Sequence, residues 1–143
     1  MGINIADTIN FLSKATTKRY VNAARVYSSY QLSRMTGQAR VAGLPISIAI
    51  EPTTSCNLRC PECPSGLRSF TRPTGMLAQP LYRDIIDQLA PYLSYLTFYF
   101  QGEPYLHPDF LKMVSYATSK GIYTTTSTNA HYLTDERARL TVA

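Results

Sequence analysis

The sequence predicts an α/β fold with parallel strands, and the order of its elements is the main reason. From residue 46 onward, short β-branched or aromatic runs alternate with amphipathic helical patterns. A β-α-β-α-β-α order implies parallel strands joined by right-handed crossovers. A break at Gly43-Leu44-Pro45 separates this region from two helical patterns before it. We therefore expect a basic helical extension over residues 1–43 and a core domain over residues 44–143.

The extension is predicted to form two helices, over residues 3–14 and 17–36, with Gly37 at the position favoured just after a helix end. An apolar stripe runs along the second helix, opposite Lys18 and Arg25, and such a stripe usually packs on the body of its own protein. We therefore expect the stripe to pack on the core domain. Its members are Tyr20, Ala24, Tyr27 and Met35.

The extension also carries the net charge of the chain. Residues 1–50 contain six basic side chains and one acidic one, whereas the basic and acidic side chains of residues 51–143 balance. An acidic peptide, RNA or a membrane surface would be attracted by this charge, and a solvated helix face is the alternative. For the whole chain we expect no nucleic-acid partner and no membrane span, because no apolar stretch is long enough to cross a bilayer.

The core elements are predicted from periodicity and from their end signals. The strands are expected at residues 46–50, 95–100 and 122–127, and the helices begin near Pro80, Pro108 and Thr134. The second strand is almost continuously apolar, which predicts cover on both faces. Residues 65–79 are predicted to be an extended connection. The buried positions of the first two helices are expected to be Leu81, Ile85, Ile86, Leu89 and Leu93, then Phe110, Leu111, Val114 and Ala117.

The three cysteines of the chain, Cys56, Cys60 and Cys63, lie together in a loop after the first predicted strand. Three cysteines cannot all pair within one chain, and no secretion signal precedes them, which favours reduced, metal-binding thiols. Three thiolates can hold three corners of a cubic iron–sulfur cluster and leave the fourth iron open. A structural zinc ion is the alternative, but neither His107 nor His131 stands at a ligand-like spacing from the cysteines.

This C-x3-C-x2-C spacing resembles the signature of the radical S-adenosylmethionine (radical SAM) enzymes. Two further motifs support the resemblance, which covers residues 46–143. One follows the second strand and is similar to a Gly-Gly-Glu-Pro element, and the other follows the third strand and is similar to a Thr-Asn-Gly turn. They are Gln101-Gly102-Glu103-Pro104 and Thr128-Asn129-Ala130. Both stand where parallel α/β folds bind ligands. The stretch from Cys56 to Cys63, with its Leu58-Arg59 pair and the proline that follows, resembles the SPASM-associated branch, which includes peptide-modifying enzymes and sulfatase maturases.

The resemblance implies a fold and a chemistry. The fold would be the first three βα units of a (βα)6 partial TIM-type barrel. Cys56, Cys60 and Cys63 would hold a [4Fe–4S] cluster whose open iron binds S-adenosylmethionine. The cofactors would yield a 5′-deoxyadenosyl radical that abstracts hydrogen, perhaps from a peptide or protein substrate. The remaining cofactor-binding residues would be Gly102, Glu103 and Pro104 near the amino group, Glu62 near the adenine, and Asn129.

Other expectations follow from the same resemblance. A one-electron reductant of flavodoxin or ferredoxin type would be a partner, and the protein would be cytoplasmic. Because the family core needs six βα units, we expect this chain to be a truncated piece that is inactive or weak in isolation. No catalytic residue is predicted. A non-catalytic iron–sulfur or zinc module is an alternative, as is a partner protein recognised through its basic helices.

Several single residues keep two interpretations. Glu51 could meet a substrate or pair with Arg59, and Asn129 could simply cap a turn. Arg68 and Arg72 could reach a substrate carboxylate or be solvated loop charges.

Overall fold

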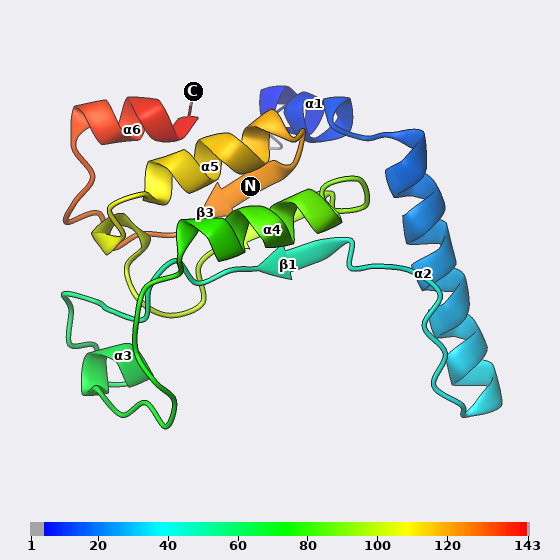
Figure 1. Ribbon diagram of the computed structural model, residues 1–143, viewed down its shortest axis with the longest axis horizontal. Coiled ribbons are helices and arrows are strands. Elements are labelled where there is room, and N and C mark those ends of the chain that lie inside the picture. The colour runs from blue at the N-terminus through cyan, green and yellow to red at the C-terminus, as the bar shows by residue number, and fades with distance from the viewer. Residues whose placement is uncertain (1–4, 143) are drawn as a thin grey trace.

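A small parallel sheet is the centre of the fold, seen in a computed structural model that describes residues 5–142 (Figure 1). Its strands are β1 (Ser47–Ala49), β2 (Tyr95–Phe98) and β3 (Tyr123–Thr126), in the order β1-β2-β3. Both pairings are parallel, with Ser47 opposite Tyr95 and Tyr95 opposite Tyr123. The parallel α/β fold predicted from the order of elements is confirmed, although each strand is shorter than its predicted range.

Two helices pack on the sheet and form the core with it. They are α4 (Gln79–Leu89) and α5 (Phe110–Ser119). Tyr82 of α4 packs its ring against Phe98 of β2, and its hydroxyl donates to the Met113 carbonyl of α5 at 2.7 Å. The fully buried core side chains are Tyr82, Ile86, Leu93, Leu96, Phe98, Phe110, Met113, Ala117 and Ile122. Burying a large apolar side chain contributes about 2 kcal/mol, so this group dominates the stability of the core.

Two predictions about burial in the core are wrong. Leu81 is 54% exposed, and Tyr82 takes the inward position instead, because Tyr82, Ile86 and Leu93 share one face of the packed segment. The second strand is not covered on both faces either. Leu96 and Phe98 are buried, but the alternate positions of the strand are half-exposed. An apolar or aromatic residue therefore does not by itself decide which face of a strand is covered.

Four more helical segments complete the described chain: α1 (Ile5–Ser13), α2 (Thr17–Thr36), α3 (Pro64–Leu67) and α6 (Asp135–Val142), with a 3-10 turn, η1 (Pro104–Leu106). The α2 boundaries match the prediction. Thr16 accepts a bond from the Arg19 N–H at its start, and Gly37 follows its end with φ +69°. The short helix α3 lies in a stretch predicted to be extended. Among residues 5–142, no helix combines the length and apolar character that crossing a membrane would require.

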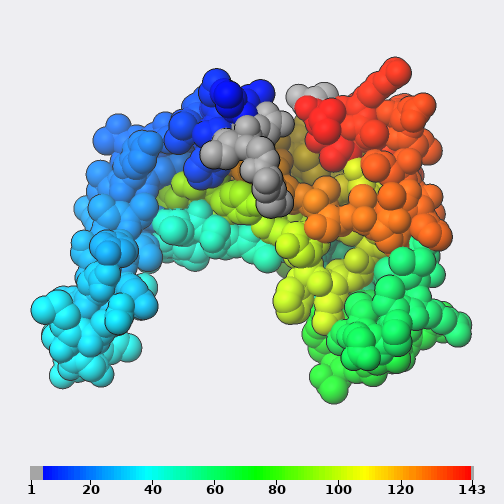
Figure 2. All heavy atoms as spheres, turned by 180° about the vertical axis from the view of Figure 1, so that it is seen from behind, coloured from blue at the N-terminus to red at the C-terminus, as the bar shows by residue number. Residues whose placement is uncertain are grey.

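Helix α2 is anchored at one end and otherwise stands away from the sheet. Figure 2 shows α2 on one side of the molecule and the region around α3 on the other, as two separate limbs. The anchor is the buried Arg19 guanidinium, whose Nη2 donates to the carbonyls of Ala90, at 2.9 Å, and Lys120, at 3.2 Å. Its Nη1 donates to the Gly121 carbonyl. These carbonyls lie at the C-terminal ends of α4 and α5, where a positive charge is stabilised.

The predicted docking of the α2 apolar stripe is wrong. Tyr20 and Tyr27 are each 63% exposed and Met35 is 84% exposed. The buried residues of α2 are polar instead: Arg19, Asn22 and Ser29. Asn22 bonds both the N–H and the carbonyl of Leu44 at 2.9 Å and so fixes the returning chain to the helix. Specific hydrogen bonds, and not the apolar stripe, hold this helix in place within the described residues.

Replacing Arg19 with alanine is expected to lower the free energy of unfolding by about 2 kcal/mol, because charge-assisted bonds to buried carbonyls are lost. Arg19→Lys should recover only part of the loss, since an ammonium cannot span the ends of two helices as a guanidinium does. Urea denaturation measures both, with the exposed Arg25→Ala as a control. Equal midpoints for Arg19→Ala and Arg25→Ala would contradict this role.

Candidate metal centre

The three cysteines lie on the loop that joins β1 to α3. None is in a disulfide; Cys56 and Cys63 are half-buried and Cys60 is exposed. The Cys63 N–H donates to the Cys60 carbonyl at 3.2 Å, and Cys63 is the residue just before α3. Hydrogen bonds from the backbone of Gly66, and then from Ser65, lower the pKa of the Cys63 thiol. A thiol with a lowered pKa is more readily a thiolate, the form that binds metal.

Gly66 allows α3 to pack directly on the cysteine loop. A Cβ atom at this position would lie 2.5 Å from both the nitrogen and the carbonyl oxygen of Cys60. These distances are far shorter than a van der Waals contact. The backbone of Cys60 has little room to move away. Only glycine therefore permits this approach, and the turn that carries Cys60 and Cys63 depends on it.

The three cysteines share one loop, but their side chains are not gathered as a closed metal cage. Within residues 5–142, no group of three or more Cys, His, Asp or Glu side chains is gathered as the ligands of a single ion. His107 is buried and its Nε2 bonds the Leu77 carbonyl at 3.0 Å, while His131 is exposed. The chemistry of the donor set, which is three unpaired thiols on one loop, fits a thiolate-held iron–sulfur cluster.

The end of β2 is bound closely to this loop through Gly102. Its φ is +78°, and a Cβ atom there would lie 2.1 Å from the Thr53 carbonyl oxygen. The Gly102 N–H donates to Ser65 Oγ at 3.1 Å, and the Glu103 N–H donates to the Ser55 carbonyl at 2.8 Å. The Gly-Glu-Pro motif is thus held against both the start of the cysteine loop and α3.

The Glu103 carboxylate connects the second and third motifs. The residue is 1% exposed, and its Oε1 accepts bonds from Thr128 Oγ1, at 2.7 Å, and from the Tyr105 N–H, at 3.1 Å. Its Oε2 accepts the Asn129 N–H at 2.8 Å. The side chain of Glu103 therefore faces the interior and holds the turn after β3. Only the backbone of this residue is left for the cofactor contact that the sequence predicts.

Asn129 caps the turn after β3 and also contacts the cysteine loop. Its Oδ1 accepts the His131 N–H at 3.0 Å, which is a turn-capping contact. Its Nδ2 lies 2.9 Å from Asn57 Oδ1 and 3.8 Å from Cys56 Sγ. The structure therefore brings the Thr-Asn-Ala turn, the Gly-Glu-Pro motif and the first cysteine together at the carboxyl edge of the sheet.

Ala130 occupies a backbone conformation that favours glycine, since its φ is +66°. Replacing it with glycine is expected to stabilise the chain by about 1 kcal/mol, the cost of a left-handed residue with a Cβ atom. Ala138→Gly in α6 is the matched control and should destabilise by about as much, because glycine weakens a helix. Urea midpoints that move in the same direction for both variants would refute this explanation.

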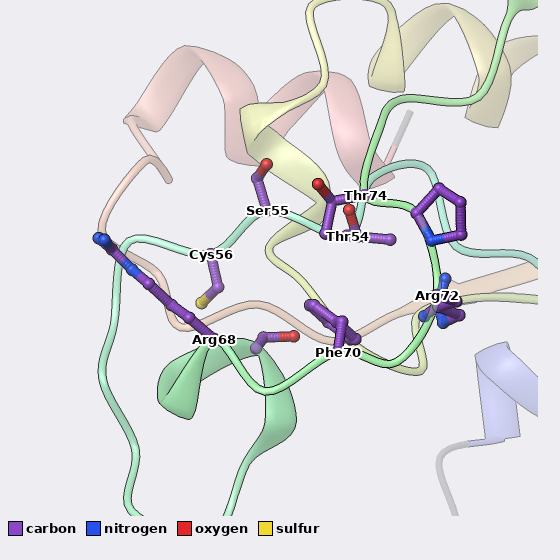
Figure 3. A pocket seen from close by; sticks show the side chains of 9 residues that line it. Thr54, Ser55, Cys56, Arg68, Phe70, Arg72 and Thr74 are labelled. Atoms are coloured by element: carbon purple, nitrogen blue, oxygen red, sulfur yellow. The ribbon is translucent and has the colours of Figure 1, made fainter.

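A cavity of about 570 Å³ lies between the start of the cysteine loop and the segment after α3 (Figure 3). Cys56 and Arg68 line it on one side, and Phe70 and Arg72 line it on the other. Arg72 forms an ion pair with Glu51 at 2.7 Å, so the partner of Glu51 is Arg72 and not Arg59. Sequence spacing could not reveal this pair, because the chain returns to Glu51 only after passing through α3.

The remaining predicted site residues lie as follows. Glu62 is exposed on the turn between Cys60 and Cys63 and does not line the cavity. Pro104 is buried at the start of η1. Sequence reasoning missed Ser65, Gly66 and Asn57 as residues that support the site. A signal for the first two was present, since Pro64 directly after Cys63 stands where a helix commonly begins.

The chain is similar in sequence to a protein named as a maturase and to one named as a peptide cyclase. No family model matches it. It is 37% identical over 94 residues to mycofactocin maturase MftC of Mycobacterium tuberculosis, covering 66% of this chain and 24% of that protein. It is 30% identical over 107 residues to the PqqA peptide cyclase of Bradyrhizobium diazoefficiens, covering 74% of this chain and 28% of that one. The chain therefore spans about a quarter of the length of these curated relatives.

Solved structures show a similar arrangement of elements. BtrN, in a crystal structure with AdoMet and 2-DOIA, superimposes with a TM-score of 0.63 at 27% identity, over 69% of this chain and 42% of BtrN. Streptococcus suis SuiB, in a crystal structure with S-adenosylmethionine, gives a TM-score of 0.56 over 80% of this chain and 25% of SuiB. At 17% identity, the likeness to SuiB concerns the fold alone.

Proposed function

Because this chain belongs to the radical S-adenosylmethionine superfamily, we propose that it binds a [4Fe–4S] cluster and S-adenosylmethionine at its cysteine loop. Cys56, Cys60 and Cys63 are the cluster ligands in this proposal, and the open iron binds the amino acid part of S-adenosylmethionine. The observation that carries it is the hydrogen-bonded connection from Glu103 to Asn129 and from Asn129 to the Cys56 sulfur. This connection joins three motifs that lie far apart in the sequence at one edge of the sheet.

Each part of the site has a task in this proposal. The lowered pKa of Cys63 favours the thiolate that binds iron. Gly102 and Glu103 offer backbone groups to the amino end of S-adenosylmethionine, Asn129 and Pro104 support the same region, and Glu62 offers its backbone to the adenine. When bound, the two cofactors supply a 5′-deoxyadenosyl radical that removes a hydrogen atom from an unreactive carbon.

The substrate class follows from the relatives. Two are a maturase and a peptide cyclase by name, which favours a peptide or protein substrate for this chain. The cavity beside Cys56 carries Arg68 and Arg72. Arg72 is paired with Glu51, so the Arg68 guanidinium is the group that suits an acidic or carboxylate-bearing substrate. A flavodoxin- or ferredoxin-like protein supplies the electron. Residues 44–143 form the part of the enzyme core present here, the beginning of a partial barrel, and residues 1–43 are its extension.

Loading the chain with iron and sulfide in the absence of oxygen tests this proposal. We expect about four irons and four sulfides per chain, as a cubic cluster requires. The variant with Cys56, Cys60 and Cys63 all replaced by alanine should take up neither. Its urea midpoint, compared with that of the unloaded parent, controls for folding. A parent chain that binds zinc and holds no inorganic sulfide would refute the proposal.

A further inference from the structure

The Asn129 amide is placed to act on the cluster ligand Cys56. It reaches from the turn after β3 across to the cysteine loop, and its Nδ2 lies 3.8 Å from Cys56 Sγ. We propose that Asn129 donates a hydrogen bond to the Cys56 thiolate and thereby raises the reduction potential of the bound cluster. The inference rests on the proposed function, because it assumes that Cys56 ligates iron.

The orientation of the amide is determined by its neighbours. Its oxygen accepts the His131 N–H at 3.0 Å, which turns the nitrogen toward the loop. An amide nitrogen carries two hydrogens. One is directed to Asn57 Oδ1, at 2.9 Å, and the other remains for the sulfur. Reversing the amide would place its oxygen against the Asn57 oxygen and its nitrogen against the His131 N–H, so the contacts exclude the opposite assignment.

The backbone of Asn129 is fixed as firmly as its side chain. Its N–H donates to Oε2 of the buried Glu103 at 2.8 Å, and Oε1 of Glu103 accepts the hydroxyl of Thr128 at 2.7 Å. A donor held by a rigid surrounding acts on its acceptor without a further loss of conformational freedom. Glu103 is therefore a positioning residue for Asn129 and acts on the sulfur only through it.

A hydrogen bond to a cysteine sulfur changes the electronic state of the cluster. Donors withdraw electron density from the thiolate and so stabilise the reduced, more negative cluster, which raises its potential. Cys56 Sγ also accepts the Leu58 backbone N–H at 3.5 Å. That second donor cannot be removed by a side-chain substitution. Asn129 is therefore the part of this hydrogen-bonding environment that a mutation can test.

Asn129→Asp is the deciding variant. Its side chain has the same shape, keeps an oxygen for the His131 N–H and leaves the backbone bond to Glu103 intact. It replaces the donor with a negative oxygen near the thiolate. We expect the midpoint potential of the loaded chain to become more negative, and Asn129→Ala to shift it by a smaller amount in the same direction. His131→Ala should leave it unchanged, because it keeps the backbone N–H that bonds Asn129.

The measurement is a redox titration of the loaded 143-residue chain, followed by electron paramagnetic resonance of the reduced cluster. A purely structural role for Asn129 would change cluster content or urea stability without moving the potential. An Asn129→Asp potential equal to that of the parent, in a chain that holds its cluster, would overturn this inference and leave the proposed function standing. A parent chain that takes up no iron and sulfide would overturn both.

Discussion

Replacing Gly102 with alanine is expected to lower the free energy of unfolding by about 3 kcal/mol. A left-handed residue with a Cβ atom costs about 1–2 kcal/mol, and Gly102 has φ +78°. The new carbon would also lie 2.1 Å from the Thr53 carbonyl oxygen, and relieving such overpacking costs about 1–3 kcal/mol more. Because Gly102 joins the end of β2 to the cysteine loop, the variant should also hold a bound cluster less well.

Gly75→Ala is the matched control for this variant. A Cβ atom at Gly75 would meet nothing within 4 Å, and its φ is not in the left-handed region. The same glycine-to-alanine change should therefore be neutral or slightly stabilising there. Urea denaturation of both unloaded variants measures the difference. If Gly102→Ala unfolded at the same urea concentration as Gly75→Ala, the close packing at Gly102 would be refuted.

Replacing Glu103 with alanine is expected to cost about 3–4 kcal/mol, the largest effect among the polar substitutions. It leaves the Thr128 hydroxyl and the N–H groups of Asn129 and Tyr105 without their buried acceptor. Each unsatisfied buried donor costs about 1–3 kcal/mol, and relaxation toward solvent recovers part of the sum. Glu103→Gln should be less harmful, because its amide oxygen can still serve one side of the network.

The readout for Glu103 is again the urea midpoint, together with the amide exchange rate of Asn129. Glu136, at the exposed start of α6, provides a carboxylate control whose removal should have a small effect. The exchange rate separates the turn from the whole fold, since loss of the acceptor should free the Asn129 N–H first. If Glu103→Ala had the same urea midpoint and the same Asn129 exchange rate as Glu136→Ala, Glu103 would not hold the turn.

Local patterns were sufficient to predict the strands and the longer helices, but not the short helix α3. The α2 boundaries followed from Thr16 and Gly37, and the parallel pairing of the strands followed from the order of elements. What could not be predicted depends on residues far apart in sequence. Arg19 contacts Gly121 across 102 positions, and no helical periodicity indicates that a basic residue will bond the ends of two other helices. The exposed stripe of α2 shows the same limit, because polar bonds determined the docking.

For the candidate site too, one part could be predicted from the sequence and another part required the structure. The spacing of Cys56, Cys60 and Cys63 was enough to propose a cluster, since all three thiols lie on one loop. The tasks of Glu103 and Asn129 required the structure, because each side chain bonds a residue from another strand end. A Gly-Glu-Pro sequence alone does not show that its carboxylate is buried.

Coordination of S-adenosylmethionine by the open iron is the property that decides whether the proposed function is right. The measurement is the electron paramagnetic resonance spectrum of the loaded and reduced chain, recorded before and after S-adenosylmethionine is added. Direct coordination changes the electronic environment of one iron, so we expect a clear change in the spectrum. An identical spectrum at saturating S-adenosylmethionine, from a chain with a full complement of iron and sulfide, would contradict it.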